Sequence, residues 1–320
     1  MRNHTRIAAP AVALASALGI MGSTPGLAQF KSGIQTVLLT VTVTDRAGHY
    51  VAGLTPDAFT IFEDGKAQTL SYFAAVDAPV DLALLLDNSS SMQVDFRLAQ
   101  DAACGLTRQL RPGDRVALSG IASHTFNAQT LTSDLGRVEQ SIRSMEAFGP
   151  TAIYEGVYVL FRELQRQPGG PSGSEVRRRA IVLLSDGLDN ASRVEFDHVL
   201  DSVRRGDIVV YVILLDRGLK GQMDREESGE ALRARFAMGS LARESGGRIF
   251  TPQAASELPG IYDTVARELR NQYLLGYSPR RQEGDGTFRR ITVGVQHPDA
   301  VRARTRAGYF AVAPRARASR

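Results

Sequence analysis

Five oxygen-bearing side chains that could bind a metal ion lie in three separate segments of the sequence. Asp87, Ser89 and Ser91 lie in LLLDNSSSM, Thr151 lies in FGPTAIYEG, and Asp186 lies in IVLLSDGLDN. Two carboxylates and three hydroxyls form an all-oxygen ligand set. Such a set suits a hard divalent cation, with Mg²⁺ as the first choice and Mn²⁺ and Ca²⁺ as alternatives. The residue types therefore indicate a site that binds a cation.

The surrounding sequence indicates which elements must position these side chains. Near-continuous apolar runs, typical of parallel strands buried on both faces, occur at Val80–Leu86, Arg115–Ile121, Ala180–Leu184 and Ile208–Leu215. Amphipathic segments between them predict helices, one of them with an apolar stripe formed by Leu98, Ala102, Leu106 and Leu110. The alternation predicts a doubly wound, mostly parallel α/β domain over residues 79–272. Because ligands bind at the carboxyl ends of the strands in such sheets, we expect the three segments to meet at that edge.

Both flanks of this domain have the patterns of β-strands. The N-terminal segment, residues 30–78, alternates apolar and polar side chains in VLLTVTVT and carries the turn sequence EDGK. The C-terminal segment, residues 273–313, contains the strand-like runs YLLGY and RITVGV. Two or three strands alone are marginally stable in water. We therefore predict that the two segments pair into one β-sandwich-like domain, with the α/β domain inserted between them.

The two ends of the chain have distinct compositions. Residues 1–28 have the features of a cleavable signal peptide: Arg2 and Arg6, an apolar stretch, and small residues before Gln29. This predicts a secreted, periplasmic or cell-envelope protein with no transmembrane segment after cleavage. Residues 314–320 are predicted to be a disordered basic tail.

The composition sets limits on function. The net charge is +4, from 38 basic and 34 acidic residues, and the arginine clusters lack interleaved aromatic residues, so no nucleic-acid partner is predicted. Cys104 is the single cysteine, which excludes an intramolecular disulfide. It lies among apolar helix positions, and we interpret it as a small buried hydrophobic residue.

Each candidate segment alone has a simpler explanation. Asp and Ser before a helix can be N-caps, Thr151 is open to the same interpretation, and Ser185-Asp186-Gly187 can be an ordinary turn. All three segments, however, occur in order and in one α/β domain. Asp87-x-Ser89-x-Ser91, Thr151 and Asp186-Gly187 together resemble the metal-ion-dependent adhesion site of von Willebrand factor type A (VWA) domains. With VTVTDRAGHYVAG before the domain and YLLGYSP after it, the chain also resembles the secreted bacterial VWFA-related domain proteins.

The resemblance implies roles for the five residues. Ser89, Ser91 and Thr151 would offer hydroxyls to the cation, and Asp87 and Asp186 would hold it directly or through water. An Asp or Glu side chain of a protein partner would complete the coordination shell. Two alternatives stay open, namely a scaffold whose metal only stabilises the loops and a metal-assisted hydrolase. We expect no enzyme activity, because the sequence contains no acid–base constellation.

Overall fold

The computed structural model describes the chain in six ranges: residues 36–75, 78–122, 125–167, 176–215, 229–299 and 302–312. The predicted signal peptide, residues 1–28, and the predicted tail, residues 314–320, lie outside them. No helix of the described residues is long and apolar enough to span a membrane.

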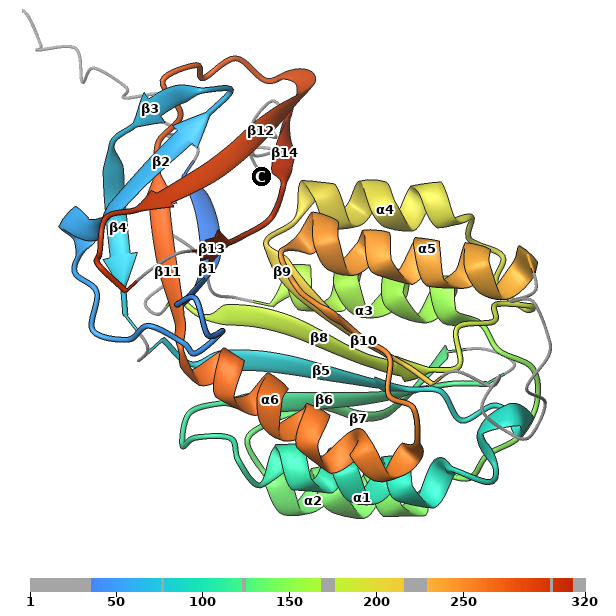
Figure 1. The fold of residues 1–320 in the computed structure, drawn as a ribbon. Helices are drawn as coiled ribbons and strands as arrows, with labels where there is room; N and C mark the ends of the chain where they lie inside the picture. The colour runs from blue at the N-terminus through green and yellow to red at the C-terminus, as the bar shows by residue number, and fades with distance from the viewer. Residues whose placement is uncertain are drawn as a thin grey trace, which may run out of the picture. The chain divides into compact units, whose positions relative to one another are not determined.

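A six-stranded sheet occupies the centre of the α/β domain (Figure 1). Its strand order is β10-β9-β8-β5-β6-β7. The bounds are β5 Val80–Leu86, β6 Arg115–Ile121, β7 Thr125–Thr132, β8 Arg178–Ser185, β9 Ile208–Leu214 and β10 Ile249–Phe250. All neighbours pair in parallel except β6 and β7, which are antiparallel. The structure thus confirms the predicted α/β fold class and adds β7, an antiparallel edge strand that lacks a long apolar run.

Helices cover both faces of this sheet (Figure 1). Their bounds are α1 Phe96–Thr107, α2 Leu135–Ser144, α3 Ile153–Arg166, α4 Phe196–Arg205, α5 Gly229–Ser245 and α6 Leu258–Arg270. Helices α1, α2 and α6 pack with one face, and α3, α4 and α5 with the other. The central strand β5 shows why: Leu82, Leu84 and Leu86 enter one core, whereas Ala83 and Leu85 enter the other. Successive side chains of a strand point to opposite faces, so both layers bury apolar residues from the same run.

Helix α1 differs in one respect from the predicted apolar stripe through Leu98, Ala102, Leu106 and Leu110. Ala102 and Leu106 are buried, but Leu98 is 45% exposed, and Leu110 lies beyond the end of the helix. The buried face is instead completed by smaller residues such as Ala99 and Ala103. Cys104 is fully buried and is a free thiol, in agreement with its interpretation as an apolar core residue.

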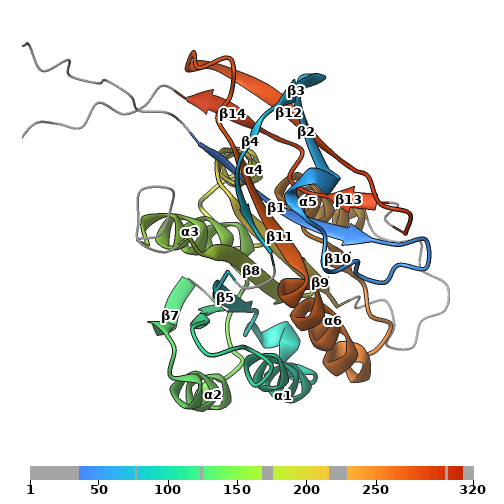
Figure 2. The same cartoon turned by 90° about the vertical axis from the view of Figure 1, so that its left-hand side faces the viewer.

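Strands from both sides of the α/β domain form two further sheets (Figure 2). One has the order β13-β1-β11-β4 and the other β14-β12-β2-β3. The bounds are β1 Val37–Thr44, β2 Phe59–Glu63, β3 Lys66–Gln68, β4 Leu70–Ala74, β11 Gln272–Tyr277, β12 Asp285–Val295, β13 Arg302–Arg304 and β14 Gly308–Val312. Strand β1 pairs with β11, and β2 pairs with β12, both antiparallel. One apolar core lies between the two sheets and contains Leu39, Val41 and Tyr273.

Three buried carboxylates in this framework are paired with arginines. Asp81, at the start of β5, accepts from Arg115 at 2.7 Å and from Arg177 at 2.8 Å. Glu268 of α6 pairs with Arg304 of β13 and also accepts a hydrogen bond from the Tyr211 hydroxyl at 2.7 Å.

Glu63, at the end of β2, lies 3.4 Å from the guanidinium of Arg289 and accepts from the hydroxyls of Tyr277 and Tyr309 at 2.7 and 2.9 Å. In each of the three cases the cost of burying a charge is offset by an opposite charge and by hydrogen bonds.

Candidate metal centre

Asp87 directly follows β5 and is completely buried. Its backbone amide continues the sheet by donating to the Leu184 carbonyl at 2.9 Å. One carboxylate oxygen, Oδ1, accepts from the Ser89 amide at 2.9 Å, which turns the chain out of the strand. The chain then enters a short 3₁₀ helix, Ser90–Met92, before α1 begins at Phe96. The carboxylate is thereby fixed at the carboxyl end of the central strand.

The two serines after Asp87 bring their hydroxyls together. The Oγ atoms of Ser89 and Ser91 lie 2.8 Å apart and are hydrogen-bonded, with Ser89 buried and Ser91 exposed. Ligand oxygens at ~2.0–2.1 Å from an octahedral Mg²⁺ are about 2.9 Å from their neighbours. The separation of the hydroxyls therefore matches one edge of such a coordination shell. Ser91, on the exposed side, brings this edge to the protein surface.

The second loop is fastened to the first by backbone hydrogen bonds. The Ser90 amide donates to the Gly149 carbonyl at 2.9 Å, and the Phe148 amide donates to the Asn88 carbonyl at 2.7 Å. The Asn88 side-chain amide adds a bond to the Glu146 carbonyl at 2.8 Å. Gly149 has a φ of +73°, a conformation that few residues other than glycine adopt. These bonds hold the chain in place two residues before Thr151, which is buried.

The third loop is linked to both of the others. The Ser185 hydroxyl donates to Oδ2 of Asp87 at 2.5 Å, and Ser185 Oγ accepts from the Gly187 amide at 3.0 Å. Asn190 Oδ1 accepts from the Thr151 amide at 2.8 Å, and the Thr151 carbonyl accepts from the Asn190 amide at 3.0 Å. Hydrogen bonds thus unite all three predicted segments at one edge of the sheet.

Gly187 adopts a left-handed backbone conformation in the third loop. Its φ is +85°, and a Cβ atom there would lie 2.4 Å from Leu214 Cδ1, at the end of β9. The backbone conformation favours glycine, and any side chain here would also displace the Leu214 methyl group. Asp186 precedes it, is partly exposed, and its Oδ1 accepts from the Leu188 amide at 3.3 Å.

Two positioning residues are not apparent from the sequence alone. Ser185 orients the Asp87 carboxylate, and Asn190 orients Thr151 through its backbone amide. The printed sequence contains both, in SDGLDN, but their partners are 98 and 39 residues away. The excess of Asp, Asn and Gly in this segment indicates a turn and does not reveal which loops the turn contacts.

The electrostatics of Asp87 differ from those of the other deeply buried carboxylates. Among described residues, four carboxylate side chains are 4% exposed or less: Glu63, Asp81, Asp87 and Glu268. Glu63, Asp81 and Glu268 have arginine partners, whereas the described contacts of Asp87 come from Ser89 and Ser185. Burial raises the pKa of Asp87 to about 6, with hydrogen bonds from Ser185 and Ser89 opposing the shift and the negative charge of Asp186 adding to it.

The donor set fits a hard divalent cation. A cation close to Asp87 and Asp186 would offset the burial of one carboxylate and the repulsion between the two. No cluster of three or more His, Cys, Asp or Glu side chains suited to a metal is found in the described ranges. A metal at this edge would therefore depend on the serine and threonine hydroxyls as well as on the two carboxylates. The assignment of all five residues as ligands stays a prediction.

Comparisons with known proteins agree with this description of the central domain. Residues 82–188 match the family model for the von Willebrand factor type A domain. The match spans the three loops and covers about a third of the 320 residues. No curated protein matches the chain.

Several solved structures are similar to part of this chain at low sequence identity. Proximal thread matrix protein 1 from the mussel byssus, described as having a zinc-occupied MIDAS motif, is 16% identical over 65% of this chain, with a TM-score of 0.47. The chain spans about half the length of that mussel protein, 49%. An aerotolerance-related membrane protein from Bacteroides fragilis is 20% identical over 59% of this chain and 98% of its own, with a TM-score of 0.46.

A von Willebrand factor type A protein from Catenulispora acidiphila is 11% identical over 89% of this chain and 75% of its own, with a TM-score of 0.48. The family match, together with the mostly parallel sheet and its two helical layers, defines the central part of this molecule as a VWA-type α/β domain.

Proposed function

We propose that this protein is an exported, divalent-cation-dependent protein-binding module whose metal coordinates an Asp or Glu side chain of a partner. The observation that carries the proposal is Asp87, a fully buried carboxylate whose described partners are a serine hydroxyl and a backbone amide. Ser89, Ser91 and Thr151 would hold the cation through their hydroxyls, and Asp87 and Asp186 directly or through water. When bound, the cation supplies a positive centre that attracts an anionic ligand.

The hydrogen bonds between the loops favour a binding role over a purely stabilising one. The Asp87, Thr151 and Asp186 segments are already joined through direct bonds between protein atoms. Their arrangement therefore does not require a cation as an additional cross-link. The alternative of a scaffold with a structural metal predicts that the metal contributes chiefly to folding free energy, which makes the two roles separable by experiment.

The ionisable side chains of the three loops are all carboxylates, namely Asp87, Glu146, Asp186 and Asp189, and the proposal assigns Asp87 and Asp186 to the cation. Residues 87–92, 146–151 and 185–192 contain no His, Lys, Cys or Tyr. Hydrolysis assisted by a metal ordinarily uses a positioned general acid or base within hydrogen-bond reach of the reacting atoms. The residue types therefore support the proposal of a binding module that is not an enzyme.

Exposed apolar side chains beside the loops support a protein as the partner. Phe148, in the second loop, is 49% exposed, and Val94, after the 3₁₀ helix, is 75% exposed. The Gln93 side chain donates to the Ala147 carbonyl at 3.4 Å, so the segments that carry these two residues are neighbours. Aromatic residues such as phenylalanine are enriched in protein interfaces relative to the rest of the surface. The predicted signal peptide, residues 1–28, supports export.

Calorimetric titration of Mg²⁺ and Mn²⁺ tests the metal site. Thr151→Ala should weaken metal binding at least tenfold (~1.4 kcal/mol), because one hydroxyl ligand is lost. Thr130→Ala makes the same chemical change at an exposed position of β7 and should leave the affinity unchanged. Equal affinities of both variants and the wild type would contradict the assignment of Thr151.

Capture experiments then test the partner. Wild type and Thr130→Ala should retain proteins from the native cell envelope in Mg²⁺ and release them in EDTA, whereas folded Thr151→Ala should not retain them. If the metal binds and raises the unfolding temperature but retention is the same in Mg²⁺ and EDTA, the role of the metal is structural and the binding proposal is wrong.

A further inference from the structure

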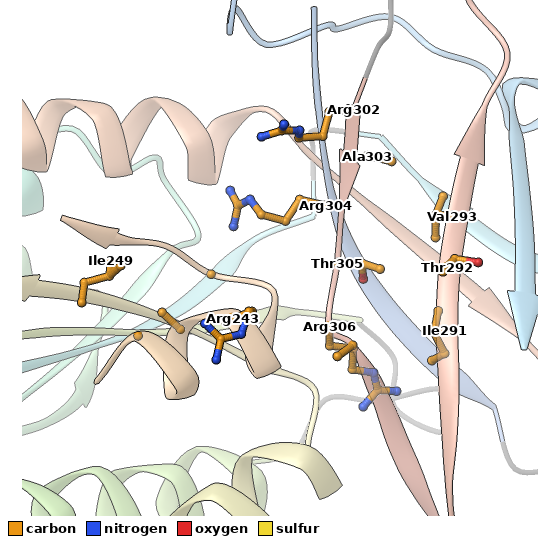
Figure 3. A pocket seen from close by; sticks show the side chains of 14 residues that line it. Arg243, Ile249, Ile291, Thr292, Val293, Arg302, Ala303, Arg304, Thr305 and Arg306 are labelled. Carbon is orange, nitrogen blue, oxygen red and sulfur yellow. The ribbon is translucent and has the colours of Figure 1, made fainter. Parts of the chain in front are cut away.

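A cavity lies away from the metal loops, between the C-terminal part of α5 and strands β12 and β13 (Figure 3). Its volume is about 580 Å³, within the ~300–1,000 Å³ of pockets that bind small molecules. Gly247, in its wall, adjoins the beginning of β9, where a Cβ atom would lie 2.0 Å from the Val210 carbonyl oxygen. The cavity is therefore at the amino ends of the sheet strands, opposite the edge that carries Asp87.

The charged side chains of this cavity are all arginines. Arg243, Arg302, Arg304 and Arg306 line it, and none of the described lining residues is acidic. Figure 3 shows that Arg302 and Arg304 extend from β13 to the same side and that Arg243 also lies on that side. Arg304 is paired with Glu268, but the ion pairs found among described residues include no carboxylate partner for Arg243 or Arg302. The wall thus carries an excess of positive charge.

Two buried polar atoms of the wall also lack partners. The hydroxyl of Thr305 and the Nε of Arg306 are inaccessible and form no hydrogen bond within the described part of the chain. Arg306 is 9% exposed, and its Nη1 donates to the Gly206 carbonyl at 2.5 Å. Burial lowers the pKa of this guanidinium. Because buried polar groups in native proteins are nearly always hydrogen-bonded, the two atoms indicate a ligand or bound solvent beside them.

The remaining wall is largely apolar. Ile249 contributes from β10, and Ile291 and Val293 contribute from β12. In Figure 3, Thr305, which follows β13, points toward the segment Ile291–Val293, whereas Ile249 lies on the same side of β13 as Arg243, Arg302 and Arg304. Arginine is well suited to phosphate groups, because its planar guanidinium offers two parallel hydrogen bonds in addition to its charge.

We propose that this cavity binds a small phosphate monoester with an apolar substituent. The phosphate lies among Arg243, Arg302 and Arg304, and the substituent contacts Ile249, on the same side of β13. The proposal uses no residue of the metal site, so it stands or fails independently of the function proposed above.

Calorimetry of the full chain in EDTA tests the proposal, with hexyl phosphate, inorganic phosphate and hexanol as the three probes. Hexyl phosphate should bind at least tenfold more tightly than either of the others, because it alone combines the charge with the apolar group. Its affinity should fall as salt is raised. Thr151→Ala should bind it as well as the wild type does.

Arg243→Gln/Arg302→Gln provides the decisive variant, because both side chains are exposed and their loss should not prevent folding. It should weaken hexyl phosphate binding at least tenfold. Arg137→Gln/Arg267→Gln removes the same charge from exposed positions of α2 and α6 and should change the affinity less than twofold. Equal losses in the two double variants, or no binding of hexyl phosphate at millimolar concentration, would overturn the proposal. Equal affinity for hexyl phosphate and inorganic phosphate would overturn its apolar part.

Discussion

Glu268 and Asp87 are both fully buried carboxylates, but their surroundings are opposite in character. Glu268 lies where α6 meets the β-sheets, and Arg304, Tyr211 and Arg248 surround it. Asp87 lies at the carboxyl end of β5, where its described contacts are a backbone amide and the Ser185 hydroxyl. The first carboxylate is neutralised by the protein itself, and the second is not.

This difference indicates what each carboxylate does. A buried charge with its own counter-charge and hydrogen bonds is a structural cross-link, and the structure loses stability when one partner is removed. A buried carboxylate with neutral donors keeps a raised pKa, as Asp87 does, and a cation from solution would supply its missing counter-charge. The comparison therefore predicts that replacing the carboxylate by a neutral side chain lowers the free energy of unfolding at Glu268 and raises it at Asp87.

The largest effect is expected from Glu268→Ala. Removing the carboxylate leaves Arg304 partly buried without its counter-charge and takes an acceptor from the Tyr211 hydroxyl. The free energy of unfolding should fall by about 3–5 kcal/mol, as measured by urea denaturation, and Mg²⁺ should not restore it. Glu283→Ala makes the same change at an exposed residue and should have little effect. If Glu268→Ala lowers the free energy of unfolding by less than ~1 kcal/mol, Glu268 is not a structural cross-link, and its contrast with Asp87 is wrong.

The fold class and the three loops were predictable because they depend on local sequence. The apolar run of β5 continues directly into Asp87, and strand direction alone places that residue at the carboxyl edge. Helix α2 and strand β7 were not among the predicted elements. Only Val138 and Ile142 of α2 are buried, so its apolar pattern is short.

Contacts between distant segments could not be predicted in this way. The arginine partner of Glu268 comes from a strand 36 residues further along, and the donor to the Asp87 carboxylate is 98 residues away. The cavity residues Arg243 and Arg302 likewise come from α5 and β13. No motif connects such positions, because tertiary packing and strand register bring them together.

Asp87→Asn is expected to raise the free energy of unfolding, by less than Glu268→Ala lowers it. In EDTA at pH 7 this change removes a desolvated negative charge that has no arginine partner among its described contacts. Urea denaturation should show a gain of about 1–3 kcal/mol, the upper end corresponding to a pKa of about 6 against the ordinary 3.8.

Asp81→Asn is the matched control, since it makes the same substitution at a buried carboxylate with two arginine partners. It should destabilise the protein. If Asp87→Asn also destabilises the protein in EDTA, Asp87 is a structural residue like Asp81, and the contrast between the two kinds of site disappears.

The smallest expected effect is the pH dependence that Asp87 gives to the folding stability. Because burial raises the pKa of Asp87 to about 6, the folded state holds this proton more tightly than the unfolded state does. The contribution of Asp87 to stability is therefore fully present below about pH 4 and is lost as pH rises through about 6. In EDTA, the stability of the wild type relative to Asp87→Asn should fall by about 1 kcal/mol between pH 5 and pH 7.

The other titratable groups contribute equally to the stability of the wild type and of Asp87→Asn, so the difference between the two stabilities reports on Asp87. Saturating Mg²⁺ should reverse this trend for the wild type, because the cation and the proton compete for the same carboxylate and the cation prevails at higher pH. A difference that is independent of pH in EDTA would mean that Asp87 is already ionised at pH 5. The protein would then be neutralising Asp87 as it neutralises Glu268, and the argument for a cation from solution would fail.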